Sequence, residues 1–396
     1  MSNESIGKLN KKQRSVGLDV LRCIAMMMVV VLHFLGKGDL LPDMMKAESW
    51  SLLGVAEWTI EAICIVAVNV YMLISGYFLC ESHFKLSRLI SLYIQLWAYS
   101  FGIGMLAYLT GLAPRDELDT YRLLTLGLPV SMGHYWFMTA YVYFYLLLPL
   151  LGMAVRKMSE VQHRVAVIML LLVICVLKSV LPFKLEMDGE GYDFLWYAIM
   201  FLVAAYIRRY EPKFINKKSS AVMMIIGMCG SLAEILAIGK VGMMTGALEY
   251  VSRVSMHYNH IFPFLGALGL FGLFIPKYSL KENDNKPHKV NVMSKIVIFI
   301  APLTLGVYLL HENVAVRYMW QEWFGCTKVD NVLGLVGYTV LAAVCVFITG
   351  VIVEFIRSRL FGLIHKGLKC IKPYKLLVEK IECVDRVFAD KICGDK

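Results

Sequence analysis

The chain has 396 residues, of which 58% are hydrophobic and only 18% are charged, and its formal net charge is +10. Soluble globular domains average about 45–50% apolar and about 25% charged residues, so this composition excludes that class and indicates a polytopic membrane protein. The ten cysteines form no CxxC pair, which argues against a zinc site or a disulfide framework. No basic block with interleaved aromatic residues points to nucleic acid.

Long apolar runs predict the spans. A helix needs about 20 mostly apolar residues to cross a bilayer. Ten runs of this kind follow one another along the chain, at residues 18–36, 55–79, 86–110, 135–155, 165–182, 193–210, 221–240, 257–275, 296–316 and 333–356. The first lacks a small-residue cleavage site and is too long for a signal-peptide core, so we expect it to be retained. The fold predicted is all-α and polytopic, with about ten transmembrane helices.

Basic residues in the loops predict the orientation. Lys and Arg accumulate in cytoplasmic loops, and here they concentrate in alternate segments, as in residues 8–14, 208–218 and 277–295. Both termini are therefore expected in the cytoplasm. The net positive charge is mostly a topology signal.

The apolar runs and the loop charges divide the chain into three predicted regions. Residues 1–17 form a cytoplasmic N-terminal segment, 18–356 the membrane domain and 357–396 a cytoplasmic tail. Apolar residues recur at helical spacing in the tail with lysines between them, which predicts a basic amphipathic segment on the inner leaflet. The polar inner loop 276–295 contains Pro287 and is predicted to be flexible.

The first run contains three strongly polar side chains, Asp19, Arg22 and His33. Ionisable groups within spans cost at least about 2.5–3.5 kcal/mol each on insertion scales, so each is a candidate for function. Asp19 and Arg22 are three residues apart and able to pair. His33 follows Arg22 by eleven positions, which returns to nearly the same helix face with a rise of roughly 16 Å. One face therefore presents a cation near the inner side and an imidazole near the outer side.

Four segments carry a resemblance to a known family. They are Asp19-Val-Leu-Arg with His33 in the first span, residues 70–78 (VYMLISGYF), residues 134–150 (HYWFMTAYVYFYLLLPL) and residues 306–311 (GVYLLH). In this order they resemble the acyltransferase 3 family, the integral membrane O-acyltransferases of surface polysaccharides. The resemblance covers roughly residues 15–356.

The resemblance implies an acyl-CoA donor, most often acetyl-CoA, and a hydroxyl acceptor on a cell-surface or lipid-linked glycan. No bound cofactor or metal is expected. His33 is the predicted base, since histidine titrates near neutral pH, with transient acyl carriage as the lesser alternative. Arg22 is predicted to bind a phosphate or carbonyl oxygen of the donor. The family's basic loop after the second span suggests Lys85 and Arg88 as donor ligands, although the second arginine expected in that loop is replaced here by Ser91.

Other polar positions are candidates of lower rank. Ser75 and Gly76 are assigned either to the donor site or to close helix packing. Glu57 and Glu61 either orient His33 and meet sugar hydroxyls or lie on a solvated outer rim. Trp136 and Tyr135 are a candidate sugar platform or ordinary interface aromatics. His311 and Glu312 are predicted to line the site, Asn69 to bond between helices, and His257 with His260 has metal-ligand spacing without a third ligand.

Two other functional classes compete with acyl transfer. A transporter or flippase for a polysaccharide precursor suits ten spans and buried polar groups equally well, and inverted repeats would favour it. A scaffold or sensor without chemistry is hard to reconcile with the intramembrane Arg22 and His33. We expect a multi-pass protein of the bacterial plasma membrane. The acyl group, acceptor and oligomeric state stay open.

Overall fold

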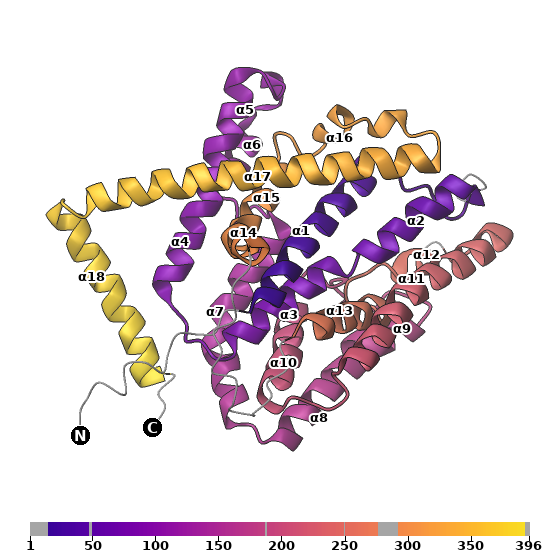
Figure 1. Ribbon diagram of the computed structural model, residues 1–396, viewed down its shortest axis with the longest axis horizontal. Helices are drawn as coiled ribbons and strands as arrows, with labels where there is room; N and C mark the ends of the chain where they lie inside the picture. Colours follow the sequence, from indigo (N-terminus) through magenta and orange to yellow (C-terminus); the bar gives the residue numbers. More distant parts are fainter. Residues whose placement is uncertain (1–14, 47–49, 187, 249, 276–291, 393–396) are drawn as a thin grey trace.

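The computed structural model describes residues 15–46, 50–186, 188–248, 250–275 and 292–392. Within these residues every regular element is a helix (Figure 1). The residues expected to form the N-terminal segment up to residue 14, and the inner loop 276–291 with most of its lysines, lie outside the described residues.

The first half of the chain contains helices α1 to α10. Their bounds are α1 Val16–Lys37, α2 Leu52–Cys64, α3 Ala67–Leu79, α4 Leu86–Trp97, α5 Gly104–Thr110, α6 Thr120–Gly127, α7 Trp136–Lys157, α8 Glu160–Leu171, α9 Leu177–Val180 and α10 Phe194–Tyr210. Two π-helical turns, η2 (Ala98–Ile103) and η4 (Leu172–Val176), and a 3-10 turn, η3 (Arg115–Glu117), join some of them. The π turns keep α4 continuous with α5 and α8 continuous with α9.

The second half contains α11 to α18. Their bounds are α11 Lys217–Thr245, α12 Val251–Val254, α13 Ile261–Phe274, α14 Val292–Ile300, α15 Thr304–His311, α16 Trp320–Trp323, α17 Val332–Leu368 and α18 Lys372–Val387. The turns η5 (Ala301–Leu303), η6 (Cys326–Lys328) and η7 (Phe388–Ile392) complete this half. Asp, Asn or Ser caps several helix starts, as Asn216 does for α11 and Asn331 for α17.

The prediction of a multi-pass helical membrane protein is confirmed. In the described residues eight helical segments are long and apolar enough to cross a bilayer, and they correspond to eight of the ten predicted runs. The other two runs are helical but shorter: 193–210 forms α10, with 17 residues, and 257–275 forms α13, with 14 residues. The latter begins late because His260 caps the helix, its Nδ1 accepting from the Phe262 N–H.

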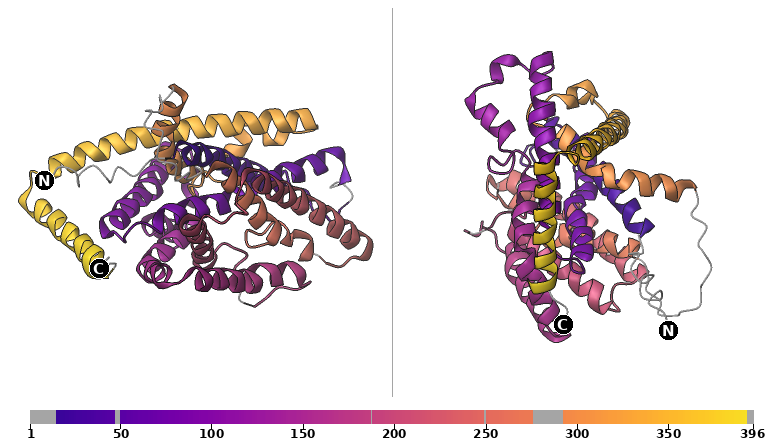
Figure 2. Two further views of the ribbon diagram at one scale, coloured as in Figure 1. Left: turned by 60° about the horizontal axis from the view of Figure 1, so that its bottom comes forward. Right: turned by 90° about the vertical axis from the view of Figure 1, so that its left-hand side faces the viewer.

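Helix α1 lies inside the bundle and packs against α2, α3, α14, α15 and α17 (Figures 1 and 2). Helix α17 crosses the molecule beside α1 and α15. It continues past the predicted end of the last span at residue 356 to Leu368, because nothing between these points breaks a helix. The predicted tail therefore begins as a continuation of α17, and α18 starts only after a turn with Pro373 at its first positions.

Two glycines let α15 approach α17 closely. A Cβ on Gly350 would lie 2.5 Å from the Val307 Cα, and one on Gly306 would lie 2.4 Å from the Glu354 Cβ. The buried Glu354 carboxylate accepts hydrogen bonds from Tyr99 (3.0 Å) and from Arg357, which ties α17 to the α4–α5 segment. Small residues at such crossings are the usual means of close helix packing in membranes. This contact fixes α15, the helix that ends at His311.

Candidate functional site

One cavity connects the two polar groups of α1. It has a volume of about 310 Å³, and both Arg22 and His33 line it. The prediction that these side chains share one face of the first helix is therefore confirmed. The remaining wall comes from α3, α4, α7, α10, the segment before α13, and the η5–α15 region. The polar or aromatic lining residues include Tyr71, Ser75, Arg88, Trp136, Tyr141, Tyr197, Tyr258, Thr304 and Tyr308.

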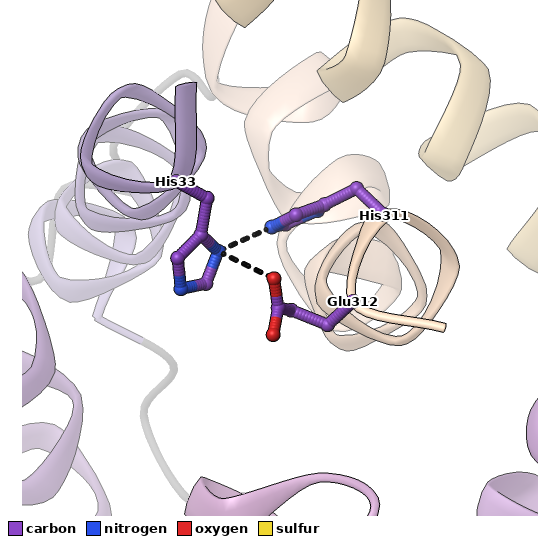
Figure 3. Close-up of side chains that lie close together, drawn as sticks. All are labelled: His33, His311 and Glu312. Atoms are coloured by element: carbon purple, nitrogen blue, oxygen red, sulfur yellow. Dashed lines mark hydrogen bonds and ion pairs between the residues drawn. The ribbon is translucent and has the colours of Figure 1, made fainter. Parts of the chain in front are cut away.

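At one end of the cavity, three side chains from opposite ends of the sequence meet. His33 Nδ1 lies 2.9 Å from His311 Nε2 and 3.2 Å from Glu312 Oε1 (Figure 3). His33 comes from the last turns of α1, His311 ends α15, and Glu312 is the residue that follows it. His311 and Glu312 are each only 3% exposed. We call this group the His33–His311–Glu312 cluster.

The hydrogen bonds assign a tautomer to each ring. His311 Nδ1 lies 2.7 Å from the Val307 carbonyl oxygen, which only accepts, so Nδ1 carries a proton. In a neutral imidazole Nε2 is then an acceptor, and it faces His33 Nδ1. His33 Nδ1–H therefore donates to His311 and to the Glu312 carboxylate. This leaves the lone pair on His33 Nε2, which points away from the cluster in Figure 3.

Lys37 completes the electrostatics of the cluster. It lies in the last turn of α1, one turn beyond His33, and its ammonium group forms an ion pair and hydrogen bond with Glu312 Oε1. In the sequence Lys37 directly follows the first apolar run, 18–36, and so has the appearance of an outer-loop charge. The i,i+4 spacing of His33 and Lys37 was the available signal, since it places both side chains over the same part of α1.

The same three side chains have ligand atoms within 4.8 Å of one another, so their geometry admits a metal ion. Two observations favour the hydrogen-bonded arrangement. The Lys37 ammonium already pairs with the Glu312 carboxylate. The separation of 2.9 Å between the two imidazole nitrogens is also that of an ordinary hydrogen bond.

The chain that follows α15 holds the cluster in place. Trp320 Nε1 donates to the His311 carbonyl (3.1 Å), and Gln321 Nε2 donates to the His33 carbonyl (3.2 Å). Asn313 Nδ2 donates to the Tyr99 carbonyl (2.8 Å). The predicted span 296–316 ends early, at His311, because the next backbone N–H groups leave the helical pattern: that of Val314 donates to His134 Nε2 and that of Ala315 to Asn313 Oδ1.

At the other end of the cavity lies Arg22. Its guanidinium donates to Asp19 Oδ1 at 3.0 Å, which confirms the predicted pair, and it lies 5.2 Å from the centre of the Phe78 ring. The side chain is 29% exposed, whereas that of Asp19 is 3% exposed. Of the residues suggested for the donor, Ser75 and Arg88 line the same cavity. This end therefore brings two guanidinium groups to one opening.

Two other donor candidates lie elsewhere. Lys85 is exposed and is not part of the cavity wall, and its backbone N–H donates to the Tyr145 hydroxyl (3.1 Å). A Cβ on Gly76 would lie 2.9 Å from atoms of Ala204 and Phe201, so this glycine serves the packing of α3 on α10. The helix-packing alternative is thus the one that the structure supports for Gly76.

Glu57 and Glu61 lie on α2 and are 5% and 9% exposed, so neither lies on a solvated rim. They are also outside the residues that line the cavity and outside the described contacts of His33. One Glu61 oxygen, Oε2, has no hydrogen-bond partner in the described residues. The structure thus gives no support to an orienting role for either carboxylate at His33.

Aromatic residues form part of the cavity wall. Trp136 stacks on Tyr258, with ring centres 5.6 Å apart and planes at 18°, and contacts Tyr192 at 4.4 Å. Tyr135 instead points to α15, where its hydroxyl donates to the Leu309 carbonyl (3.0 Å). Asn69 links three elements, donating to the Tyr258 carbonyl (2.7 Å) and accepting from Trp196 (2.8 Å), as predicted for a bond between helices.

His257 and His260 do not converge on one site. His257 Nε2 lies 3.6 Å from Glu190 and His260 Nε2 lies 3.4 Å from Glu234. Burial and the nearby Lys178 charge lower the pKa of His257 to about 4. The i,i+3 spacing of the two histidines therefore reflects separate local contacts.

The fold and site together define a multi-pass helical membrane protein with a buried histidine cluster at one end of an internal cavity. A family model described as an acyltransferase domain matches residues 15–353, nearly the whole chain, so the protein belongs to the acyltransferase 3 family. The resemblance stated from the sequence is thereby confirmed. Comparisons with curated proteins and with solved structures give no match.

Proposed function

We propose that this acyltransferase moves an acyl group, most simply acetyl, from acyl-CoA to a hydroxyl of a cell-surface or lipid-linked glycan, with His33 as the base. The observation that supports this most directly is the His33–His311–Glu312 cluster. It fixes the proton of His33 on Nδ1 and leaves Nε2 as an acceptor at the end of a cavity. A base needs this arrangement, because it must accept a proton from a group bound in the cavity.

Three side chains share the work of the proposed reaction. His33 Nε2 takes the proton of the acceptor hydroxyl as its oxygen attacks the thioester carbonyl carbon. The C–S bond then breaks, the acyl group stays on the acceptor oxygen, and the CoA thiolate receives the proton from the imidazolium. Glu312 stabilises the positive charge that develops on His33, as a carboxylate does in a catalytic dyad. His311 holds the ring in the orientation required.

The Arg22 end of the cavity suits the donor. Arg22 and Arg88 supply guanidinium groups, whose planar donors match phosphate or carbonyl oxygens. The rise along α1 from Arg22 to His33 is roughly 16 Å. A pantetheine arm is thin enough to extend along such a path and bring its thioester to His33. The Trp136–Tyr258 stack in the cavity wall offers flat apolar surfaces of the kind on which sugar rings bind.

Orientation and location follow from the same proposal. Acyl-CoA is made in the cytoplasm, so the Arg22 end faces the cytoplasm and His33 faces the outer side, in agreement with the loop charges. The protein then belongs to the plasma membrane of a bacterium, with both termini inside. A flippase function would require alternating access, whereas the hydrogen-bonded cluster suits a fixed reaction site.

The test compares glycan O-acetyl content by proton NMR in wild-type cells, deletion cells and cells with His33→Ala. We expect the variant to match the deletion while its protein level and thermal stability in detergent match the wild type. His163→Ala is a matched control, because His163 is also buried but lies outside the cavity and bonds to the Leu202 carbonyl. Full O-acetylation in the His33 variant would exclude His33 as the base, and unchanged glycan in the deletion would exclude the acceptor class.

A further inference from the structure

Helix α18 lies beyond the part of the chain that matches the family, yet it returns to the bundle. In Figure 1 it leaves the far end of α17 and runs back towards the side where α4 begins. There the Asp385 carboxylate meets the first turn of α4. Asp385 Oδ1 accepts from the backbone N–H groups of Leu86 (2.6 Å) and Ser87 (3.3 Å), and Oδ2 accepts from the Ser87 hydroxyl.

The start of α4 is suited to an anion. The first N–H groups of a helix have no partner within the helix, and the helix dipole adds partial positive charge. The residue that precedes α4 is Lys85, whose side chain makes no capping hydrogen bond, so α4 lacks a local cap. A carboxylate almost 300 positions later supplies it. Phosphate groups bind to helix starts of this kind.

The same turn reaches the cavity of the reaction site. Arg88, one residue after Ser87, lines the cavity together with Arg22 and His33. An anion held by the Leu86 and Ser87 amides is therefore next in sequence to Arg88, one of the two arginines to which the proposed function assigns the donor. In the structure both amides donate to the Asp385 carboxylate instead.

The contact that holds α18 is local. Besides Asp385, the described contacts are those of Phe388, at the start of η7, with Phe84 (ring centres 4.8 Å apart) and of Tyr374 with His365 at the end of α17 (2.7 Å between hydroxyl oxygen and Nδ1). Most of α18 is exposed, including the apolar Leu376 and Leu377. Since the Tyr374–His365 contact only joins α18 to the end of α17, the attachment on the α4 side consists mainly of one carboxylate and one ring, and it is able to open when a stronger anion takes the amides.

We propose that Asp385 is a competitor built into the chain: its carboxylate occupies the anion site at the start of α4, and a phosphate group of the donor displaces it. This inference rests on the proposed function, because it takes acyl-CoA as the donor. It adds that α18 sets the donor concentration at which the enzyme works. A donor that carries phosphate groups should displace the Asp385 carboxylate from the α4 amides. A donor without phosphate has no group that could replace it.

The experiment measures acyl transfer by the full-length protein in detergent or vesicles with two donors, acetyl-CoA and the phosphate-free acetylpantetheine. For Asp385→Ala we expect the KM for acetyl-CoA to fall about tenfold, the size expected when a competitor held by charge-assisted hydrogen bonds is removed. The kcat and the KM for acetylpantetheine should stay as in the wild type. Asp385→Asn, which keeps the shape and loses the charge, should change KM in the same direction.

Glu382→Ala is the matched control, because it removes an acidic side chain that is exposed on the same helix. Its KM values should equal those of the wild type. An Asp385 variant with unchanged KM for acetyl-CoA, or with equal changes for both donors, overturns the inference while leaving the proposed function intact. A wild-type protein that neither binds labelled CoA nor uses either donor overturns the proposed function, and the competitor role with it.

Discussion

The two ends of the cavity are built in different ways. Arg22 pairs with Asp19 on its own helix and keeps a side chain that is 29% exposed. His33 instead depends on His311 and Glu312, which are about 280 positions away and are 3% exposed. One end is thus local and partly exposed, and the other is assembled from distant segments and largely buried.

This difference indicates a division of roles. An exposed cation is able to exchange water for the oxygens of a diffusing donor at modest cost. An imidazole that is only 16% exposed and has a fixed proton is preorganised, and hydrogen bonds in such a largely buried site are electrostatically stronger than in water. Changes at the His33 end should therefore lower kcat, and changes at the Arg22 end should mainly raise KM for the donor.

The largest effect is expected for His33→Ala. A positioned general base contributes typically about 10²–10⁴-fold, so kcat should fall by that factor with little change in KM for the donor. Steady-state kinetics with purified protein measure kcat and KM separately. A variant in which KM rises and kcat is retained would place His33 in binding and not in proton transfer.

Glu312→Gln should lower kcat by about 10–100-fold, the range seen when a partner that orients a functional histidine is lost. It also leaves the Lys37 ammonium, whose side chain is 18% exposed, without its carboxylate, at a cost in stability of up to about 3–5 kcal/mol. Thermal unfolding in detergent measures the second effect.

A companion variant separates the two roles of Glu312. Combining Glu312→Gln with Lys37→Met removes the unpaired charge, so stability should recover while kcat stays low. Recovery of both would show that Glu312 acts only by keeping Lys37 neutralised.

Arg22→Ala should raise KM for acyl-CoA by about 10-fold and leave kcat within a few-fold of the wild type, since a hydrogen bond to a charged group contributes about 1.5–3 kcal/mol. Arg22→Lys keeps the charge but not the planar donor pair, and we expect it to recover only part of the affinity. A fall in kcat with unchanged KM would contradict the assignment of this end to the donor.

The smallest effect concerns His134, which precedes α7 and supports the His33 end. Its Nε2 accepts from the Val314 N–H (2.8 Å), and Nδ1 lies 2.7 Å from the Ser100 hydroxyl. Burial, aided by the Arg317 charge, lowers the pKa of His134 from 6.5 to about 3. The folded state thus binds fewer protons than the unfolded state, so stability is complete above about pH 6.5 and falls as the pH drops towards 3.

By pH 5 this loss should reach about 2 kcal/mol, and thermal unfolding at pH 7 and pH 5 measures it. His134→Gln retains a donor and an acceptor without titrating, so its stability should change less between the two pH values. An equal change in both proteins would assign the acid sensitivity to other groups.

Much of this arrangement was predictable. Apolar run lengths indicated the helices, and eight of them have the length and composition of spans. The eleven-residue interval predicted that Arg22 and His33 share a face, and both line one cavity. Lys37 was missed because a lysine at the end of a span has the composition of a loop charge. Its partner, Glu312, is known only once α1 and α15 are packed together.

The sequence did not predict where some helices end or which side chains contact residues far away in the chain. The run 296–316 is apolar throughout its first part, but Asn313 donates to the Tyr99 carbonyl and the Val314 N–H donates to His134, and α15 stops at His311. Glu57 and Glu61 have the spacing of a paired site, but they are buried on α2 and neither lines the cavity. Nothing in the tail pattern marked Asp385 as the cap of α4, because that contact joins residues almost 300 positions apart.

The sequence by itself determined that the chain is a multi-pass helical membrane protein and that one helix face carries an arginine and a histidine. The physical reason is that hydropathy and helical periodicity are local properties. The tertiary structure decided which histidine nitrogen is the acceptor, which acid and lysine accompany it, and what caps α4. These features depend on distances between side chains far apart in the chain, and only helix packing, with close approaches such as that of Gly350 on Val307, sets them.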